Sequence, residues 1–379
     1  MLTPDEIEAL GNRVQTLLDP VTDFLIADIT QRVAEAGQIT GTAAYQVWRL
    51  QNLGTSREEI YRKLEKNLNL SRKQLDRLIE ESAEAGYNFD LSRLPHGNAV
   101  AFRDSRQMQD IVTSAVKLGG MELQNITRTM GVIAPDGVVL PITEAYQKLC
   151  DFAFMQVSTG AADCGTAVRN AVRQLVNKGV QFIDYESDRH FSVESAIRRN
   201  IMGVVGNMQE NISRTNHDEL GADGWEISAH SCSAPDHEPI QGKQYTDEEY
   251  RKLNESLVRR IGTLNCGHAA YPIIIGVSRP VYSGQKLKAM REKNEDGRYI
   301  NGRHYTGYEA TQKQRDIETA IRKQKRKVMA EEQIPGSDQL DAARSKLNVL
   351  SGAYRKFSRA AGLPVQWERT FTTVPGAKY

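Results

Sequence analysis

Histidine and cysteine side chains gather at two short polar corners of this sequence. His230 and Cys232 form one corner, and Cys266 and His268 form the other, each pair separated by a single residue. In an extended strand, residues two apart project to the same face, so each corner can present an imidazole beside a thiol. Imidazole and thiolate are ligands that zinc prefers, and four of them make a closed tetrahedral site. The candidate metal ligands are His230, Cys232, His237, Cys266 and His268.

The same residues allow other interpretations. Hydrogen bonds alone can hold such a polar corner together and pin the long loop to the strand without a metal. The segments 236–240 and 265–268 resemble the Asp-His-x-x-Pro and Asn…His elements of His-Asn-His nucleases, in which histidine activates water and a metal stabilises the charge that develops on phosphate. Here the proline comes one place early and Cys-x-x-Cys pairs are missing. Cysteine nucleophiles with a neighbouring histidine are a third possibility, but no oxyanion hole is evident.

Composition limits the class of protein. The chain has 379 residues, which is more than one domain usually holds, and its 49 Lys and Arg nearly balance its 48 Asp and Glu. This balance excludes a globally basic nucleic-acid binder and leaves local patches open. We find no apolar run near the roughly 20 residues of a membrane span and no signal-peptide pattern, so we expect a protein made in the cytosol. Four scattered cysteines predict free thiols.

Helices dominate the first part of the chain. Thr3 followed by Pro4 and acidic residues predicts a helix start, and apolar residues at helical spacing continue through residues 1–86 as a run of short helices. Thr55 with Glu58, and Ser71 with Gln74, have the spacing of capping boxes. A Pro-Asp-Gly turn predicts a small hairpin. The later elements that we expect are a hairpin at 132–141, helices at 142–158, 161–178 and 193–220, and a strand at 179–185.

The last hundred residues are strongly polar. Residues 280–304 predict an exposed linker, and two helices at 305–327 and 337–361 predict a helical hairpin. Alternation over 363–374 predicts a closing strand. From Gln285 to Val328 there are thirteen Lys and Arg against six Asp and Glu, so this arm is locally basic. Basic residues that can contact DNA phosphates, or form an ordinary solvated face, are Arg322, Lys323, Lys325, Arg326 and Lys327.

These patterns predict a mainly α protein with a small α+β domain. We expect an elongated helical N-terminal region, a central α+β head domain and a C-terminal helical hairpin. The predicted domains are a helical region at 1–100, a helical domain with a small hairpin at 101–222, an α+β core at 223–280, and a linker, basic hairpin and closing strand at 281–379.

Several short motifs together resemble a known family. They are Ser228-Ala229-His230, Pro235-x-His237, Gln241-Gly242-Lys243-x-Tyr245, Asn265-Cys266-Gly267-His268 with a following proline, and Tyr308-x-x-Thr311-x-x-Gln314-Arg315-x-x-Glu318-x-x-Ile321-Arg322. In this order they resemble the minor capsid proteins of tailed phages of Gram-positive hosts, which are related to Mu F-like head morphogenesis proteins. The resemblance runs from about Tyr146 through Arg369. Cys232 and Gly267 depart from the family pattern, which expects a small or polar residue and a basic residue there.

The resemblance implies a structural virion component without catalytic activity. Such a protein is present in few copies, binds the portal protein or the major capsid protein, and assists head assembly or genome packaging and ejection. The protein is expected in the phage head interior or at the portal vertex, after assembly in the host cytoplasm. The resemblance also implies that the two polar corners are a fold signature, which a structural zinc ion can hold together. Packaged double-stranded DNA is a further expected partner of the basic helix. The alternative function is a virion-associated metal-dependent nuclease or a toxin-like passenger enzyme.

Overall fold

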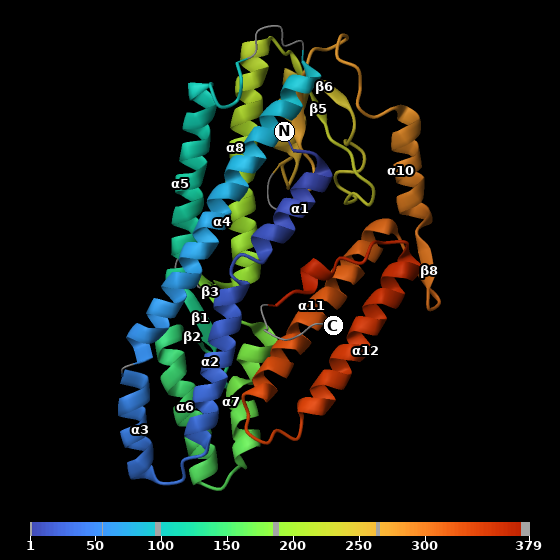
Figure 1. Ribbon diagram of the computed structural model, residues 1–379. Helices are drawn as coiled ribbons and strands as arrows, with labels where there is room; N and C mark the ends of the chain where they lie inside the picture. The colour runs from blue at the N-terminus through green and yellow to red at the C-terminus, as the bar shows by residue number, and fades with distance from the viewer. Residues whose placement is uncertain (1, 55, 95–99, 185–188, 263–265, 373–379) are drawn as a thin grey trace.

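The computed structural model describes residues 2–54, 56–94, 100–184, 189–262 and 266–372. It is mainly helical with small antiparallel sheets, as the sequence predicts (Figure 1). A long helical bundle forms one side of the molecule, a small sheet lies beside its upper end, and a helical hairpin lies beside its lower half. The bundle is built from α1 (Pro4–Gln15), α2 (Asp19–Gly37), α3 (Thr42–Gly54), α4 (Ser56–Arg93), α5 (Arg106–Arg128), α6 (Ile142–Ser158), α7 (Cys164–Lys178) and α8 (Val193–Leu220).

The start of α1 follows the capping rules, whereas the expected cap at Ser71 does not exist. Thr3 and Glu6 form a capping box, with the Thr3 N–H donating to Glu6 Oε2 at 2.8 Å. Ser71 instead lies inside α4, and its hydroxyl donates to the Leu17 carbonyl at 2.6 Å. The prediction of short helices is therefore wrong for α4, which has 38 residues. Thr55, the other expected cap, lies outside the described residues.

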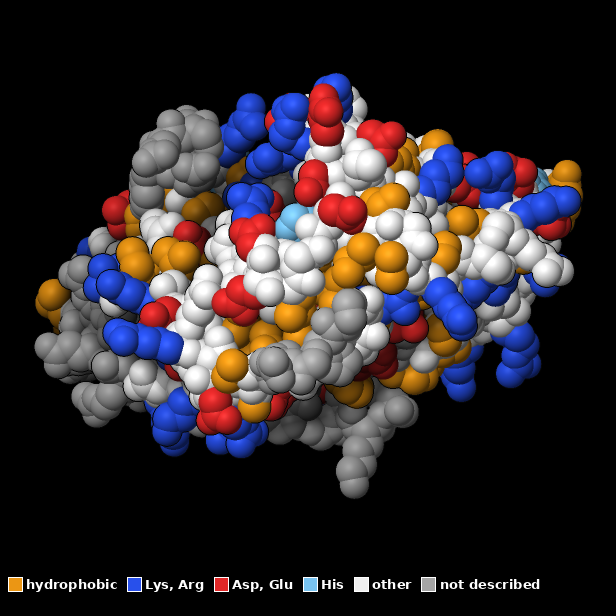
Figure 2. All heavy atoms as spheres, turned by 90° about the horizontal axis from the view of Figure 1, so that it is seen from above, with side chains coloured by type: hydrophobic (Ala, Val, Ile, Leu, Met, Phe, Trp, Pro, Cys, Tyr) orange, Lys and Arg blue, Asp and Glu red, His pale blue; other side chains and the backbone are white. Residues whose placement is uncertain are grey.

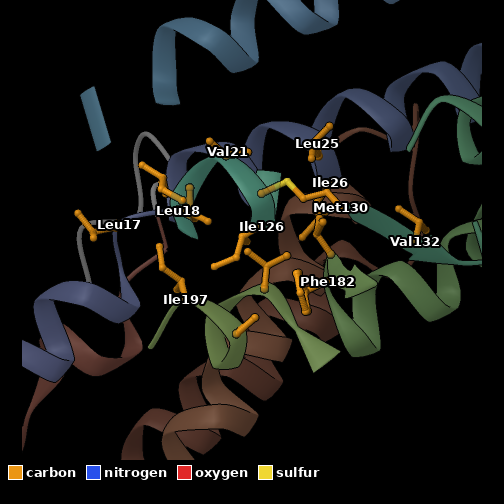
Figure 3. Packing of buried hydrophobic residues seen from close by; sticks show 14 of the residues in the cluster. Leu17, Leu18, Val21, Leu25, Ile26, Ile126, Met130, Val132, Phe182 and Ile197 are labelled. Carbon is orange, nitrogen blue, oxygen red and sulfur yellow. The ribbon is translucent and has the colours of Figure 1, made fainter. Parts of the chain in front are cut away.

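One hydrophobic core runs through the bundle. Buried side chains of α1, α2, α4, α5, α6, α7 and α8 belong to a single cluster that also includes Met329 and Ile334. Figure 3 shows Leu18, Leu25 and Ile26 facing Ile126, Phe182 and Ile197 across this core. Residues before and after position 100, the expected domain boundary, therefore share one hydrophobic core. The helices on the two sides of that boundary bury their apolar faces against each other.

A four-stranded antiparallel sheet lies within the bundle, in the order β2-β1-β3-β4. The predicted hairpin is confirmed, since Val132 of β1 pairs with Leu140 of β2 across the Pro-Asp-Gly turn. The Ala134 N–H donates to the Val138 carbonyl at 2.8 Å at the end of this hairpin. The strands are β1 (Met130–Ile133), β2 (Val139–Pro141), β3 (Gln181–Asp184) and β4 (Arg189–Ser192).

The second sheet has three strands in the order β6-β5-β7 and packs on α8 and α4. Tyr271 of β7 is fully buried, and its ring meets Phe89 of α4 edge-on with centroids 5.3 Å apart. Ile7 of α1 packs on the same cluster. This sheet is therefore held by the helical bundle. Its elements are β5 (Gly224–Ile227), β6 (Gln244–Thr246), α9 (Asp247–Ser256) and β7 (Ala270–Ile273).

The predicted linker at 280–304 is wrong, because it contains a helix and a hairpin. Ser283 accepts a hydrogen bond from the Lys286 N–H at 3.2 Å and caps α10 (Gly284–Asp296). The hairpin β8 (Arg298–Ile300) and β9 (Arg303–Tyr305) turns at Asn301 and Gly302, which have φ of 50° and 80°. Asn-Gly is a typical two-residue hairpin turn, because both positions need positive φ.

The C-terminal arms form the predicted helical hairpin, but residues 363–372, the described part of the predicted closing strand, form no strand. Helices α11 (Gly307–Glu332) and α12 (Leu340–Ala361) pack against each other. The chain then forms a short 3-10 helix, η1 (Trp367–Thr370), whose Trp367 ring contacts the buried Tyr354. The Arg369 side chain of this segment contacts α1. Its Nε donates to Asn12 Oδ1 at 3.1 Å, and its guanidinium pairs with Glu8. Side chains, rather than strand pairing, hold this segment.

Three of the five basic residues proposed for DNA point into the protein. Arg322 and Arg326 form ion pairs with Glu194 at the start of α8. The Lys325 ammonium donates to the Thr370 carbonyl at 2.7 Å. Arg322 and Arg326 therefore join the hairpin to the bundle, and Lys325 joins α11 to the end of η1 (Trp367–Thr370). The members of the set that are exposed are Lys323 and Lys327.

Removal of Glu194 tests this junction. Glu194→Ala removes the carboxylate that pairs with Arg326, which is 5% exposed, and leaves it only the charges of Asp23 and Asp19, so breaking this buried ion pair is expected to cost up to about 3–5 kcal/mol. The matched control is Glu332→Ala, which breaks the more exposed Arg344–Glu332 pair and is expected to cost about 1 kcal/mol or less. Urea unfolding of both variants measures the difference. Equal destabilisation by the two substitutions would contradict the assignment.

Asp19 gives the same junction a pH dependence. Burial is the largest cause that raises the pKa of Asp19 to about 8, and Asp23 adds to it, while three cations of α11 act in the opposite direction. The folded pKa exceeds the unfolded value of about 3.9, so the folded state favours the protonated form of Asp19. The contribution of this group to the free energy of unfolding is therefore full below about pH 4 and is lost as the pH rises through about 8. Those cations are Arg326, Arg322 and Lys325.

Asp19→Asn keeps a neutral side chain at every pH, so this variant is expected to lose less stability than the natural chain between about pH 4 and about pH 8. The difference in slope is at most about 1.4 kcal/mol per pH unit. Urea unfolding across this range gives both slopes. Parallel slopes would show that Asp19 does not titrate within this window.

Candidate metal centre

The two polar corners meet where β5 and β7 diverge. Beyond Ile227, the Ser228 N–H donates to the Ala269 carbonyl at 2.7 Å, and Ser228 Oγ accepts from the Ala269 N–H at 2.9 Å. The intervening loop returns to the strand because the Gly242 N–H donates to the Ile227 carbonyl at 2.8 Å. The sheet therefore places the loop that carries His237 beside the corner that carries Cys266 and His268.

Three of the five predicted ligands form one buried cluster. Their ligand atoms all lie within 4.8 Å of one another, and the side chains of His237, Cys266 and His268 are 1%, 7% and 2% exposed. Cys266 Sγ lies 3.3 Å from His237 Nδ1 and 3.6 Å from His268 Nδ1. The thiol is therefore placed between two imidazole nitrogens. Histidine and cysteine nitrogen and sulfur atoms at these distances have the chemistry of a zinc site.

The outer nitrogen of each imidazole donates a hydrogen bond. His237 Nε2 donates to the Arg259 carbonyl at 2.8 Å. Gln241 Oε1 accepts from the His230 N–H at 3.1 Å, which fixes it as the oxygen, so His268 Nε2, also 3.1 Å away, must be the donor to it. A neutral imidazole carries one N–H, so both Nδ1 atoms present lone pairs to Cys266.

His230 lies next to the cluster without belonging to it. Its ring centroid is 4.4 Å from that of His268, and its Nδ1 donates to the Ser231 carbonyl at 3.0 Å. This hydrogen bond leaves a lone pair on Nε2, which is buried and finds no hydrogen-bond partner among the described residues. Gly267 makes room for this ring, because a Cβ there would lie 3.0 Å from Nε2.

Cys232 points away from the cluster. Its φ of 61° is left-handed, so the corner turns sharply and the expectation that Cys232 shares a face with His230 is wrong. Its sulfur lies against Gly307 at the start of α11, where a Cβ would come within 2.7 Å of Sγ. Asn294 borders the same position, and its Oδ1 accepts from the Tyr308 N–H at 2.8 Å. Cys232 therefore belongs to the contact with the hairpin.

Burial sets the protonation of the cluster. Burial, with the neighbouring histidines and Arg259, lowers the pKa of His268 to about 2. Burial also lowers the pKa of His230 and raises the pKa of the Cys266 thiol. The imidazoles of His268 and His230 are therefore held in the neutral form, and the Cys266 sulfur keeps its proton unless a cation displaces it.

The nuclease interpretation places His237 in the role of general base. That role needs a free lone pair that reaches substrate water. His237 is buried, its Nε2 is used by Arg259, and its Nδ1 faces Cys266. Asn265, the other residue of that motif, lies outside the described residues. The geometry of His237 therefore favours a structural role.

A cavity of about 1120 Å³ reaches the cluster from the side of α1 and α8. His230 lines it together with basic and acidic side chains, among them Arg198, Arg315, Asp5 and Glu210. Viewed from above, the molecule shows Lys and Arg interspersed with Asp and Glu over this end (Figure 2). Mixed charge of this kind suits solvent and protein neighbours.

A buried carboxylate anchors the sheet under the cluster. Glu226 of β5 is fully buried, and its Oε1 accepts from the Tyr271 hydroxyl at 2.9 Å and the Val281 N–H at 2.8 Å. Its Oε2 accepts from Gln244 Nε2 at 2.9 Å. One side chain thus joins β5, β6, β7 and the segment that leads to α10. The sequence motifs do not reveal this residue, since a single Glu in a strand carries no signal.

Within the described residues, no helix combines the length and apolarity needed to cross a bilayer. The fold and site define a helix-rich structural protein with a buried histidine and cysteine cluster. Residues 2–358 match the family model described as phage minor capsid protein 2, so the chain belongs to that family and is a structural phage protein of the virion. No curated protein and no solved structure gives a significant match.

Tyr271→Phe tests the Glu226 network. The substitution removes one of three donors from a buried carboxylate, and the loss is expected to cost about 1–3 kcal/mol. Tyr299→Phe is the matched control, because Tyr299 is 79% exposed. Removal of its hydroxyl is expected to change the free energy of unfolding by no more than about 0.5 kcal/mol. Chemical denaturation compares the two. A neutral Tyr271→Phe would show that the hydroxyl does not stabilise the sheet.

Proposed function

We propose that this protein is a low-copy structural component of the phage head that binds the portal protein or the inner surface of the major capsid protein. In this role it assists head assembly and genome packaging or ejection. Membership of the minor capsid family supports the assignment to the virion. The observation that carries the partner proposal is an exposed apolar face on α3, at one end of the bundle.

Helix α3 uses only one face to pack on the bundle. Tyr45 on that face stacks on Phe154 of α6 with ring centroids 3.9 Å apart, and its hydroxyl donates to Asp151 at 2.6 Å. The opposite face carries Val47 and Leu50, which are 54% and 75% exposed. An amphipathic helix normally buries its apolar stripe, so a second apolar face fits a protein partner.

The rigid inner face of α3 supports such a contact. Arg49 forms an ion pair with Asp151 at 3.2 Å, and Arg32 of α2 donates to the Asn52 carbonyl at 3.0 Å. The helix is therefore held in place before a partner arrives. A preformed surface loses less conformational freedom on binding than one that must order.

The proposal also includes contact with packaged DNA, through two basic residues of the five predicted. Lys323 and Lys327 are the exposed members of the basic set on α11. Each phosphate contact adds affinity that falls as salt rises. Two such contacts favour DNA lying against the hairpin as a neighbour, with protein contacts through α3 providing attachment to the head.

Charge on α3 tests the proposal. Val47→Glu with Leu50→Glu places two carboxylates in the apolar face and is expected to reduce incorporation into particles at least tenfold, because each hot-spot loss costs about 1–2 kcal/mol or more. Quantitative mass spectrometry of purified particles measures incorporation, and binding to purified portal and purified major capsid protein distinguishes the two partners.

The matched control is Val349→Glu on α12, which replaces a residue that is 70% exposed and far along the chain from α3. This variant is expected to enter particles normally. Normal incorporation of the α3 double variant, with unchanged binding to both purified proteins, would overturn the role of α3. Absence of the natural protein from particles would overturn the proposed function itself.

A further inference from the structure

The buried cluster has a mismatch of donors and acceptors. Both Nδ1 atoms of His237 and His268 present lone pairs to Cys266, because their Nε2–H groups are used by Arg259 and Gln241. A thiol has one proton, so it satisfies one imidazole and leaves the other facing sulfur lone pairs. An unsatisfied buried polar atom costs about 1–3 kcal/mol. Three converging lone pairs are what a metal cation requires.

We propose that His237 Nδ1, Cys266 Sγ and His268 Nδ1 bind a zinc ion, with His230 Nε2 as the fourth ligand. Zinc bonds of about 2.0–2.3 Å in a tetrahedron place ligand atoms roughly 3.3–3.8 Å apart. The distances from Cys266 Sγ, 3.3 Å and 3.6 Å, fall in this range. Binding converts the thiol to thiolate, and the released proton passes to solvent.

His230 is suited to the fourth position. Its Nδ1–H is fixed by the Ser231 carbonyl, so its tautomer leaves the lone pair on Nε2. That lone pair is buried and has no hydrogen-bond partner among the residues described, although the ring lies beside His268. Coordination gives this atom the partner that the protein alone does not supply. His230 lies outside the three-residue cluster, so its ring must move toward His268 for Nε2 to reach the ion.

The surroundings of the three ligands match those of a metal centre. Ligating histidines usually donate their second ring N–H to a carbonyl or carboxylate, which fixes the tautomer and the ring. Arg259 and Gln241 provide such acceptors here, at 2.8 Å and 3.1 Å. A hydrogen-bonded corner without metal needs no such alignment of both Nδ1 atoms.

Zinc at this position has a structural task that is independent of the partner on α3. Four protein ligands close the coordination shell and leave no position for substrate. The ion joins the loop around His237 to the corner at Cys266 and His268, two segments that are 29 residues apart at their closest sulfur and nitrogen contact. It thereby fixes the loop and the corner at one end of the sheet, whose strand β7 packs on α8.

Cobalt titration of the reduced, metal-depleted full chain is the test. One equivalent of Co²⁺ is expected to give the visible bands of tetrahedral cobalt and a thiolate-to-cobalt charge-transfer band, and Zn²⁺ is expected to displace it. Protein purified without chelator is expected to carry one zinc by elemental analysis. These readouts use the natural sequence, so they do not depend on whether a variant folds.

Variants assign the ligands. Cys266→Ser is expected to abolish the charge-transfer band, and His230→Ala to weaken Zn²⁺ binding by at least about tenfold. Cys232→Ser is the matched control in the same region, since its sulfur lies toward Gly307, and it is expected to keep the band. A natural chain without tetrahedral cobalt bands would overturn the site. Unchanged affinity in His230→Ala would overturn the fourth ligand, and loss of the band in Cys232→Ser would overturn the assignment of sulfur.

Discussion

Burial of one face of α8 along the length of the helix is the constraint on which the structure depends. This helix has 28 residues, and it contacts α1, α4 and α5 in the bundle and β7 in the second sheet. Its apolar residues recur at helical spacing on the side of the core. Gly206 is needed within it because a Cβ there would lie 2.5 Å from the Gly262 carbonyl, in the loop that leads to Cys266. The helix therefore positions both the core and the site.

Periodicity was a reliable guide where packing is regular. The bounds predicted for 142–158 and 193–220 agree with α6 and α8, and the hairpin at 132–141 is present, because these segments bury continuous apolar faces. The polar composition of residues 280–304 predicts a linker, whereas Asn301-Gly302 indicates the hairpin turn that the structure contains. Apolar alternation near Trp367 has the period of a strand, but its ring is used against Tyr354.

The site could be predicted in part. Spacing placed Cys266 and His268 together, and the return of the loop brought His237 to them. Spacing could not show the positive φ of Cys232 or the packing of its sulfur against Gly307 of α11. It also could not show that Arg322 and Arg326 face Glu194, since a run of basic residues has the same sequence on a surface or at a packed junction. Tertiary contacts decide both.

The contact between Arg369 and α1 has a consequence for biosynthesis. Arg369 meets Asn12 across 357 positions of the chain, and it also pairs with Glu8. A ribosome releases the first helix long before it makes the segment that completes that helix's surroundings. A product that ends before Arg369 therefore lacks the partner of Asn12 and Glu8, so the surroundings of α1 are completed only when nearly the whole polypeptide has been made.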